Sequence, residues 1–230
     1  MTEVHNHVVV PPVFDSHHVN AFFTTKALHC DVHGLAEFLA VPPVNIYMPI
    51  QKHTDKIMVL DYDRVPKVAD AVITGNRGIF IGVQVADCVP VLLFDKKKQV
   101  VGAVHAGWRG TAASILKKTI EMMSQRFFSS PPDIGIAIGP SIRGCCYEVG
   151  DEVIEPVVRA SGEGDYYRTN GGKYCLDLAS ANRQQAVSCG VSPEQIWLTD
   201  ECTYCRPEKY YSYRFAKGPT GRQCGVIGIV

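Results

Sequence analysis

A cysteine and a histidine flank a predicted β-hairpin in the middle of the chain, and their side chains could act together. Residues 89–94 and 100–104 are apolar and predict two consecutive strands, with a charged turn at Lys96-Lys97 between them. If the hairpin is centred on that turn, Cys88 lies directly opposite His105 on one face, with Cβ atoms about 5 Å apart. The turn lacks Asn-Gly or Asp-Gly, and a register error of one residue would place the two side chains on opposite faces.

This pair is compatible with two kinds of chemistry. A thiolate and an imidazole can bind one metal ion, or the cysteine can be a nucleophile with the histidine as its base. His53 lies in a polar loop between two predicted strands and would complete a Cys-His-His set with an open fourth position, as in catalytic zinc sites. The same ligand types bind copper. The alternative is structural, because most lone thiols are buried as small hydrophobic groups and a loop histidine needs no role.

Two further motifs contain residues that bind anions or metals. Gly107 and Gly110 flank Arg109 just before a predicted helix, where Arg109 could bind a phosphate. The alternative is a glycine-dependent turn with Arg109 in a surface ion pair, and the spacing does not decide between them. Cys202-Thr203-Tyr204-Cys205 has the spacing of a metal knuckle. No second C-x-x-C or H-x₃₋₅-H accompanies it, so the sequence predicts no structural zinc there.

The elements that must position these residues are short apolar runs separated by Asp, Gly and Pro. Besides the hairpin, strands are predicted over 19–25, 44–50, 57–60, 71–74, 79–85, 134–138, 196–199, 210–213 and 225–230. An apolar stripe from Ile115 to Phe127 predicts an amphipathic helix. Because the strands come in runs, we predict an α/β (α+β-like) single domain over residues 19–230, with a mixed or antiparallel sheet and three to four flanking helices. Residues 1–18 are predicted to form a flexible N-terminal arm.

Composition argues against several classes of protein. The 230 residues contain 23 basic and 23 acidic side chains, so nothing indicates nucleic acid or an anionic membrane as the main partner. No apolar run approaches the ~20 residues that span a bilayer. The first seven residues contain an early acid and no basic segment before an apolar stretch, so we expect no secretory signal and a cytoplasmic location. The nine cysteines are then expected to be reduced thiols.

Several blocks of the sequence resemble one known family. They are Ala86-Asp87-Cys88-Val89-Pro90-Val91-Leu92, Ala103-Val104-His105-Ala106-Gly107-Trp108-Arg109-Gly110, Ile138-Gly139-Pro140-Ser141-Ile142 and Cys146-Tyr147-Glu148-Val149. In this order they resemble the bacterial polyphenol-oxidoreductase (laccase-domain) family, whose members are regarded as purine nucleoside phosphorylases. The tail, with Cys202-Thr203, Tyr211-Ser212-Tyr213-Arg214 and Gly221-Arg222, is also similar. The match extends from about Asn20 to Val230.

The resemblance implies a site and an activity. Zinc would be held by His53, Cys88 and His105. The substrates would be phosphate and purine nucleosides, namely adenosine, inosine and S-methyl-5′-thioadenosine, with adenosine deamination as a side activity. Arg109 and Lys26 would lie near the phosphate, and Asp87 would support the metal site or transfer a proton.

The chain departs from the family pattern at two places. Lys26 stands where the family usually has an arginine, and lysine lacks the two-pronged guanidinium that grips phosphate. Thr54 follows Gln51-Lys52-His53 in place of a glycine. There are two alternative hypotheses about function, one based on the same residues and one on the family's older name. One is a metal-free cysteine hydrolase with Cys88 as nucleophile and His105 as base. The other is copper-dependent phenol oxidation, which needs several His-x-His pairs, whereas the chain has one, His5/His7.

Overall fold

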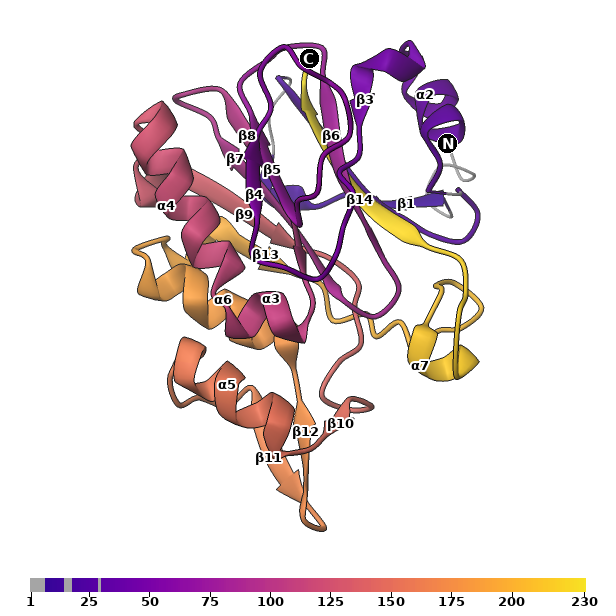
Figure 1. Cartoon of the computed structure of the whole chain (residues 1–230), viewed down its shortest axis with the longest axis vertical. Coiled ribbons are helices and arrows are strands. Elements are labelled where there is room, and N and C mark those ends of the chain that lie inside the picture. Colours follow the sequence, from indigo (N-terminus) through magenta and orange to yellow (C-terminus); the bar gives the residue numbers. More distant parts are fainter. Residues whose placement is uncertain (1–6, 15–17, 29) are drawn as a thin grey trace.

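Two large β-sheets form the centre of the structure, a computed structural model that describes residues 7–14, 18–28 and 30–230 (Figure 1). The first has five strands, in the order β1 (Val8–Val9), β2 (Val19–Thr24), β14 (Gln223–Ile229), β6 (Phe80–Val85) and β3 (Ile46–Tyr47). The second has six, in the order β13 (Ile196–Leu198), β9 (Ile134–Ile138), β7 (Val89–Asp95), β8 (Val100–Ala106), β5 (Ala71–Thr74) and β4 (Ile57–Val59). Both sheets mix parallel and antiparallel pairs.

The sheets pack against each other because their central strands are apolar on both faces. In β7, Leu92 packs with the first sheet, whereas its neighbours Val91 and Leu93 pack with helices on the other side. Those helices are α3 (Trp108–Ala112), α4 (Ile115–Phe127) and α6 (Leu178–Ser188). On the outer face of the first sheet lies α2 (Val32–Leu39). The result is a stack of helices, sheet, sheet and helix (Figure 1).

A smaller unit extends from one end of this stack (Figure 1). It comprises α5 (Asp151–Ser161) and an antiparallel sheet of β10 (Glu148–Val149), β12 (Lys173–Leu176) and β11 (Tyr167–Asn170). The remaining elements are α7 (Tyr213–Ala216) and the 3₁₀ turns η1 (Pro12–Phe14), η2 (Pro43–Asn45), η3 (Pro131–Asp133) and η4 (Pro193–Gln195). Among the described residues, no helix is long and apolar enough to cross a membrane.

The predicted mixed α/β class is confirmed, with some differences in detail. Four helices of at least eight residues are described, namely α2, α4, α5 and α6, with α3 and α7 as shorter additions. The prediction of a strand over 210–213 is wrong, because the Ser212 side chain accepts from the backbone N–H of Phe215 and begins α7 there. Part of the predicted flexible arm is packed on the domain, since β1 pairs with β2 and Phe14 is buried in the core. Residues 1–6 and 15–17 of that arm lie outside the described residues.

The central hairpin forms as predicted, but its register differs by two residues. Asp95 pairs with Val100 across a four-residue turn, so His105 lies opposite Pro90 and not opposite Cys88. Because side chains alternate with a period of two, this shift keeps Cys88 and His105 on the same face as diagonal neighbours. Continuing this register, Gly107 is the residue opposite Cys88.

Candidate metal centre

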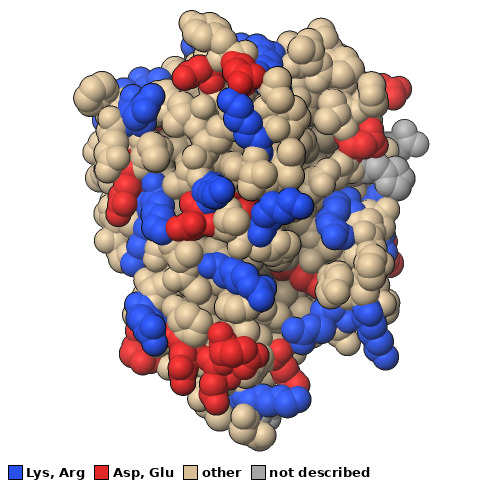
Figure 2. Space-filling view, viewed as in Figure 1, with Lys and Arg blue, Asp and Glu red and all other residues tan. Residues whose placement is uncertain are grey.

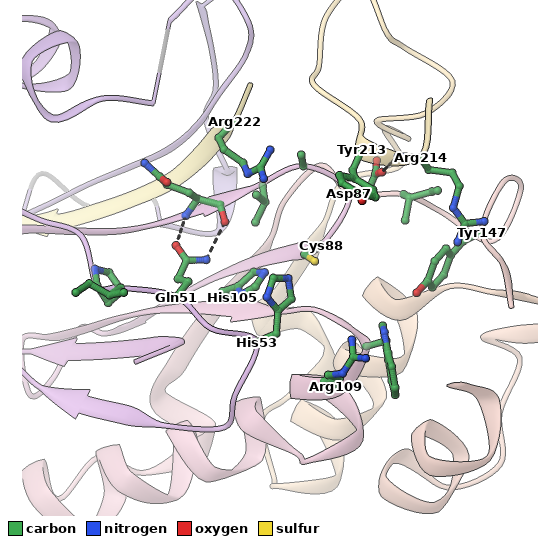
Figure 3. Close-up of a pocket in the computed structure, with 17 residues that line it drawn as sticks. Gln51, His53, Asp87, Cys88, His105, Arg109, Tyr147, Tyr213, Arg214 and Arg222 are labelled. Carbon is green, nitrogen blue, oxygen red and sulfur yellow. Dashed lines mark hydrogen bonds between the residues drawn. The ribbon is translucent and has the colours of Figure 1, made fainter. Parts of the chain in front are cut away.

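Three side chains from separate segments converge at one end of the central hairpin (Figure 3). Cys88 directly precedes β7, His105 lies near the end of β8, and His53 lies in the loop before β4. Their ligand atoms all lie within 4.8 Å of one another. The two imidazole rings meet edge to face, with centroids 4.8 Å apart and an interplanar angle of 78°. We call these three residues the metal triad.

A buried carboxylate holds two members of the triad in place. Asp70, just before β5, is fully buried, and its Oδ1 accepts from His105 Nδ1 at 2.8 Å and from the backbone N–H of His53 at 3.0 Å. Oδ2 accepts from the backbone N–H of Lys52 and from both the N–H and the hydroxyl of Thr54. Because Nδ1 of His105 is engaged by Asp70, its Nε2 is left for a metal, as is usual for metal-binding histidines.

The loop that carries His53 is tied to the opposite sheet by a side-chain amide. Gln51 Nε2 donates to the carbonyl of Gln84, and Gln51 Oε1 accepts from the Gln84 N–H, both at 2.8 Å (Figure 3). His53 itself has a φ of 57°, which non-glycine residues seldom adopt. Asp70 and Gln51 together therefore fix a strained backbone that points the His53 ring at Cys88.

A glycine makes room for the sulfur. A Cβ added to Gly107 would lie 3.0 Å from Cys88 Sγ and 3.4 Å from His53 Cδ2. A Cβ at this position would crowd the Cys88 sulfur and fill the remaining space beside the His53 ring.

We expect Gly107→Ala to weaken metal binding by about 10-fold or more, because a shift of a few tenths of an ångström in the Cys88 sulfur spoils the coordination geometry. Competition with a chromogenic zinc chelator measures this affinity. Gly218→Ala is the matched control, since a Cβ there meets nothing within 4 Å. Equal affinities for both variants would contradict the steric argument.

The ionisation of Cys88, His105 and Asp70 is coupled. Burial opposes ionisation of Cys88, but hydrogen bonds and charge from His105 and His53 outweigh it and lower the Cys88 pKa to about 6. Burial likewise opposes protonation of His105, yet Asp70 and Cys88 raise the His105 pKa to about 9. Burial disfavours the charged form of Asp70 too, and its bonds from His105 and Thr54 outweigh this and lower its pKa. Without metal, Cys88 and His105 therefore form a thiolate–imidazolium pair, and His105 releases a proton when it binds a metal ion.

The donor set itself fits a metal ion with an open coordination position. One thiolate and two imidazoles are ligands for both zinc and copper, and three protein ligands leave room for a reactant. The buried Asp70 carboxylate behind His105 is the partner that such a histidine ligand needs.

The triad opens into a cavity of about 740 Å³. Its lining includes three arginines, Arg109, Arg214 and Arg222, and the rings of Trp108, Tyr147 and Tyr213. Arg222 and Arg109 lie on opposite sides of the triad, and Arg214 and Tyr147 lie toward a third side (Figure 3). On the face of the molecule shown in Figure 2, basic side chains gather around the middle, whereas acidic side chains gather near α5. The cavity is therefore suited to an anion beside a flat ring.

Two of the three residues predicted to assist catalysis line this cavity. Arg109 stacks its guanidinium on Trp108, 4.2 Å from the ring centroid, and within the described part of the chain it has no ion pair. Asp87 also lines the cavity, but its Oδ1 accepts from the Thr203 hydroxyl and its Oδ2 from the Arg214 N–H, each at 2.7 Å. Both carboxylate oxygens are therefore engaged by the protein.

The third predicted residue, Lys26, is not brought into this group. Its ammonium donates to the carbonyl of Pro207 and lies 5.0 Å from the Tyr211 ring centroid. Lys26 is absent from the residues that line the cavity. Its contacts instead anchor the segment that leads to α7.

Sequence reasoning missed Asp70 and assigned no role to Arg214 or Arg222. The signal for Asp70 was a carboxylate inside an apolar run, Ala69-Asp70-Ala71-Val72, where burial demands partners. The two arginines come from the C-terminal segment, and no local pattern links them to the hairpin.

The chain is similar to known proteins over most of its length. Residues 24–230 match the family model described as multi-copper polyphenol oxidoreductase laccase. The purine nucleoside phosphorylase YlmD of Bacillus subtilis is 36% identical over 171 residues, which are 74% of this chain and 62% of that protein. The adenosine deaminase RL5, from an unknown prokaryotic organism, is 36% identical over 193 residues, covering 78% and 73% of the two chains.

A solved structure shows the same fold. The crystal structure of YlmD from Geobacillus stearothermophilus superposes with a TM-score of 0.89 at 30% identity, covering 97% of this chain and 96% of the other. Because the family model spans nearly the whole sequence, the chain belongs to the multi-copper polyphenol oxidoreductase laccase family.

Proposed function

We propose that this protein is a zinc-dependent purine nucleoside phosphorylase. Its substrates would be phosphate and adenosine, inosine or S-methyl-5′-thioadenosine, and adenosine deamination would be a side activity. The observation that carries the proposal is one cavity that joins the metal triad to three arginines and several aromatic rings. Relatives named purine nucleoside phosphorylase and adenosine deaminase support the same assignment.

The reaction breaks the bond between the purine and C1′ of the ribose and joins a phosphate oxygen to that carbon. Arg109, Arg214 and Arg222 would bind the phosphate and orient it, because guanidinium groups match phosphate oxygens in pairs. Tyr213, an exposed ring in the cavity lining, would offer a ring face for the purine. Zinc held by the triad would supply a Lewis acid for polarising an oxygen or activating a water.

Asp87 would act through its neighbours in this scheme. Its carboxylate binds Thr203 and the backbone of Arg214, so it fixes the position of one of the phosphate-binding arginines. We therefore propose a positioning role for Asp87 and none in proton transfer.

The decisive experiment follows the products of the zinc-loaded protein. Adenosine, inosine and S-methyl-5′-thioadenosine are each incubated with and without phosphate, and the products are separated by chromatography. Free base and a ribose 1-phosphate appearing only with phosphate support the proposal. Failure to cleave any of these nucleosides in the presence of phosphate overturns it. Inosine formed from adenosine without phosphate would report the deaminase activity.

We expect Arg109→Gln to raise the KM for phosphate by about 10- to 100-fold, the worth of a charged hydrogen bond, with a smaller change in the KM for inosine. Steady-state kinetics with each substrate varied in turn measures the two constants. Arg126→Gln, on the exposed face of α4, is the matched control and should leave both unchanged. Equal increases in both KM values for Arg109→Gln would contradict a specific phosphate contact.

A second candidate function, a metal-free cysteine hydrolase, is favoured by one observation. The lowered pKa of Cys88 beside His105 is what a nucleophilic cysteine with a histidine partner requires. Complete removal of zinc decides between the two. A phosphorylase loses activity and recovers it when zinc is returned, whereas a cysteine hydrolase stays active without metal.

Copper-dependent phenol oxidation has little support in the site. Among the described residues, the histidine-containing cluster has two histidines and one cysteine, too few for several coupled copper ions. Of the His5/His7 pair, His5 lies outside the described residues. Copper remains an alternative ion for the metal triad itself.

A further inference from the structure

Four cysteines outside the metal triad meet in the structure. Cys145 and Cys146 lie in the turn before β10, and Cys202 and Cys205 lie in the segment between β13 and α7. Their sulfur atoms all lie within 4.8 Å of one another, although the two pairs are more than fifty residues apart in sequence. We call these four residues the cysteine cluster.

We propose that the cysteine cluster is a second metal site, which binds one structural zinc ion through four thiolates. The second pair of ligands, absent from the C-x-x-C pattern, is the adjacent pair Cys145-Cys146. The prediction that no structural zinc binds at Cys202-x-x-Cys205 depended on the absence of a partner pair, and the structure supplies one.

The distances suit a tetrahedral site. Sulfur atoms bound at about 2.3 Å to a tetrahedral zinc lie about 3.8 Å from one another. Cys205 Sγ lies 3.7 Å from Cys145 Sγ and 3.2 Å from Cys146 Sγ. All four residues are free thiols. Small shifts of these side chains would bring the four sulfurs to equal distances from a central ion.

A backbone donor already orients one of the four sulfurs. The backbone N–H of Arg143 points to Cys202 Sγ at 3.4 Å, a contact of the kind that orients and stabilises a metal-bound sulfur. Cys202 is buried, whereas Cys145 and Cys205 are exposed, so zinc can enter from solvent. Four protein ligands leave no open position, which is typical of structural and not of catalytic zinc. On binding, the thiols release their protons to solvent.

The cluster joins two segments that both contact Asp87 in the cavity wall. The segment around Cys145 is bound to the cavity wall through Ile142, whose N–H donates to the carbonyl of Asp87 at 3.0 Å. The segment around Cys202 reaches the same residue through the Thr203 hydroxyl. A zinc ion would therefore clamp together the two segments that hold Asp87, and so brace one wall of the cavity.

The test uses the full chain carrying Cys88→Ala, which removes the thiolate of the triad and leaves the cluster intact. The protein is purified with reductant and without chelator. We expect one zinc per chain by elemental analysis, with a shell of sulfur neighbours alone at about 2.3 Å by X-ray absorption. Adding Cys205→Ser should remove most of this zinc, whereas adding Cys189→Ser, a thiol outside both groups, should not.

Several results would overturn the proposal. They are Cys88→Ala protein free of zinc, a zinc shell without sulfur neighbours, and full zinc content after Cys205→Ser. Disulfides within the cluster in protein purified anaerobically would also do so. If Cys205→Ser fails to fold, the absorption spectrum of the Cys88→Ala protein decides alone. None of these readouts involves activity, so the outcome is independent of the proposed phosphorylase function.

Discussion

Replacing Cys88 with alanine is expected to abolish metal binding at the triad and phosphorolysis together. The thiolate is the one anionic ligand of the three, and its charge partly neutralises the metal ion. Without it, two imidazoles alone would have to hold the ion, one of them on an exposed loop. Loss of a metal that supplies several kcal/mol of transition-state stabilisation corresponds to a rate loss on the order of 10³-fold or more.

The measurement must separate this metal from the one proposed at the cysteine cluster. Zinc content should fall by one equivalent per chain, and the zinc signal with nitrogen neighbours should vanish from the X-ray absorption spectrum. Cys189→Ala, which removes a thiol from the end of α6, should leave both metal content and turnover unchanged. Nitrogen-bound zinc that persists in Cys88→Ala would show that the ligand assignment is wrong.

The sequence correctly predicted that Cys88 and His105 lie on the same face of the hairpin. That result depends only on whether the register shifts by an even or an odd number of residues, not on the exact length of the turn. Centring the hairpin on Lys96-Lys97 gave a register two residues away from the real one, since Gln99, with a φ of 53°, closes a longer turn than expected. A slip of two residues preserves the face of every side chain. Cys88 and His105 therefore still meet, with His53 supplied by the neighbouring loop.

The other parts of the site could not be predicted from local patterns. Arg214 and Arg222 reach the cavity because β14 lies between β2 and β6, a pairing of the chain's end with distant strands that no local motif encodes. The adjacent pair Cys145-Cys146 has no knuckle spacing, so its role becomes visible only when the segment from β13 folds over it. The role of Lys26 near phosphate stays a prediction from family likeness, since its ammonium donates to a backbone carbonyl and does not line the cavity.

The second large effect is expected from Asp70→Asn, a change that touches no cavity surface. Each carboxylate oxygen of Asp70 accepts at least two hydrogen bonds, so an amide NH₂ at either position would face two or more donors in a fully buried site. Unpaired buried groups and the lost charge beside His105 should lower the free energy of unfolding by on the order of 3 kcal/mol. Zinc affinity should fall by about 10- to 100-fold, because His105 and the loop of His53 lose their common anchor.

Urea unfolding measures the first effect, and competition with a zinc chelator, at a temperature where the variant is fully folded, measures the second. Asp95→Asn is the matched control, because Asp95 is equally buried in the same sheet but does not contact the triad. Its Oδ1 accepts from the backbone N–H groups of Lys97 and Lys98, whereas its Oδ2 has no partner among the described residues. In Asp95→Asn the amide nitrogen can therefore replace Oδ2 without facing a donor. An Asp70→Asn protein that lost stability but kept its zinc affinity would limit Asp70 to a structural role. Loss of affinity in Asp70→Asn alone would establish that the buried carboxylate tunes the metal centre.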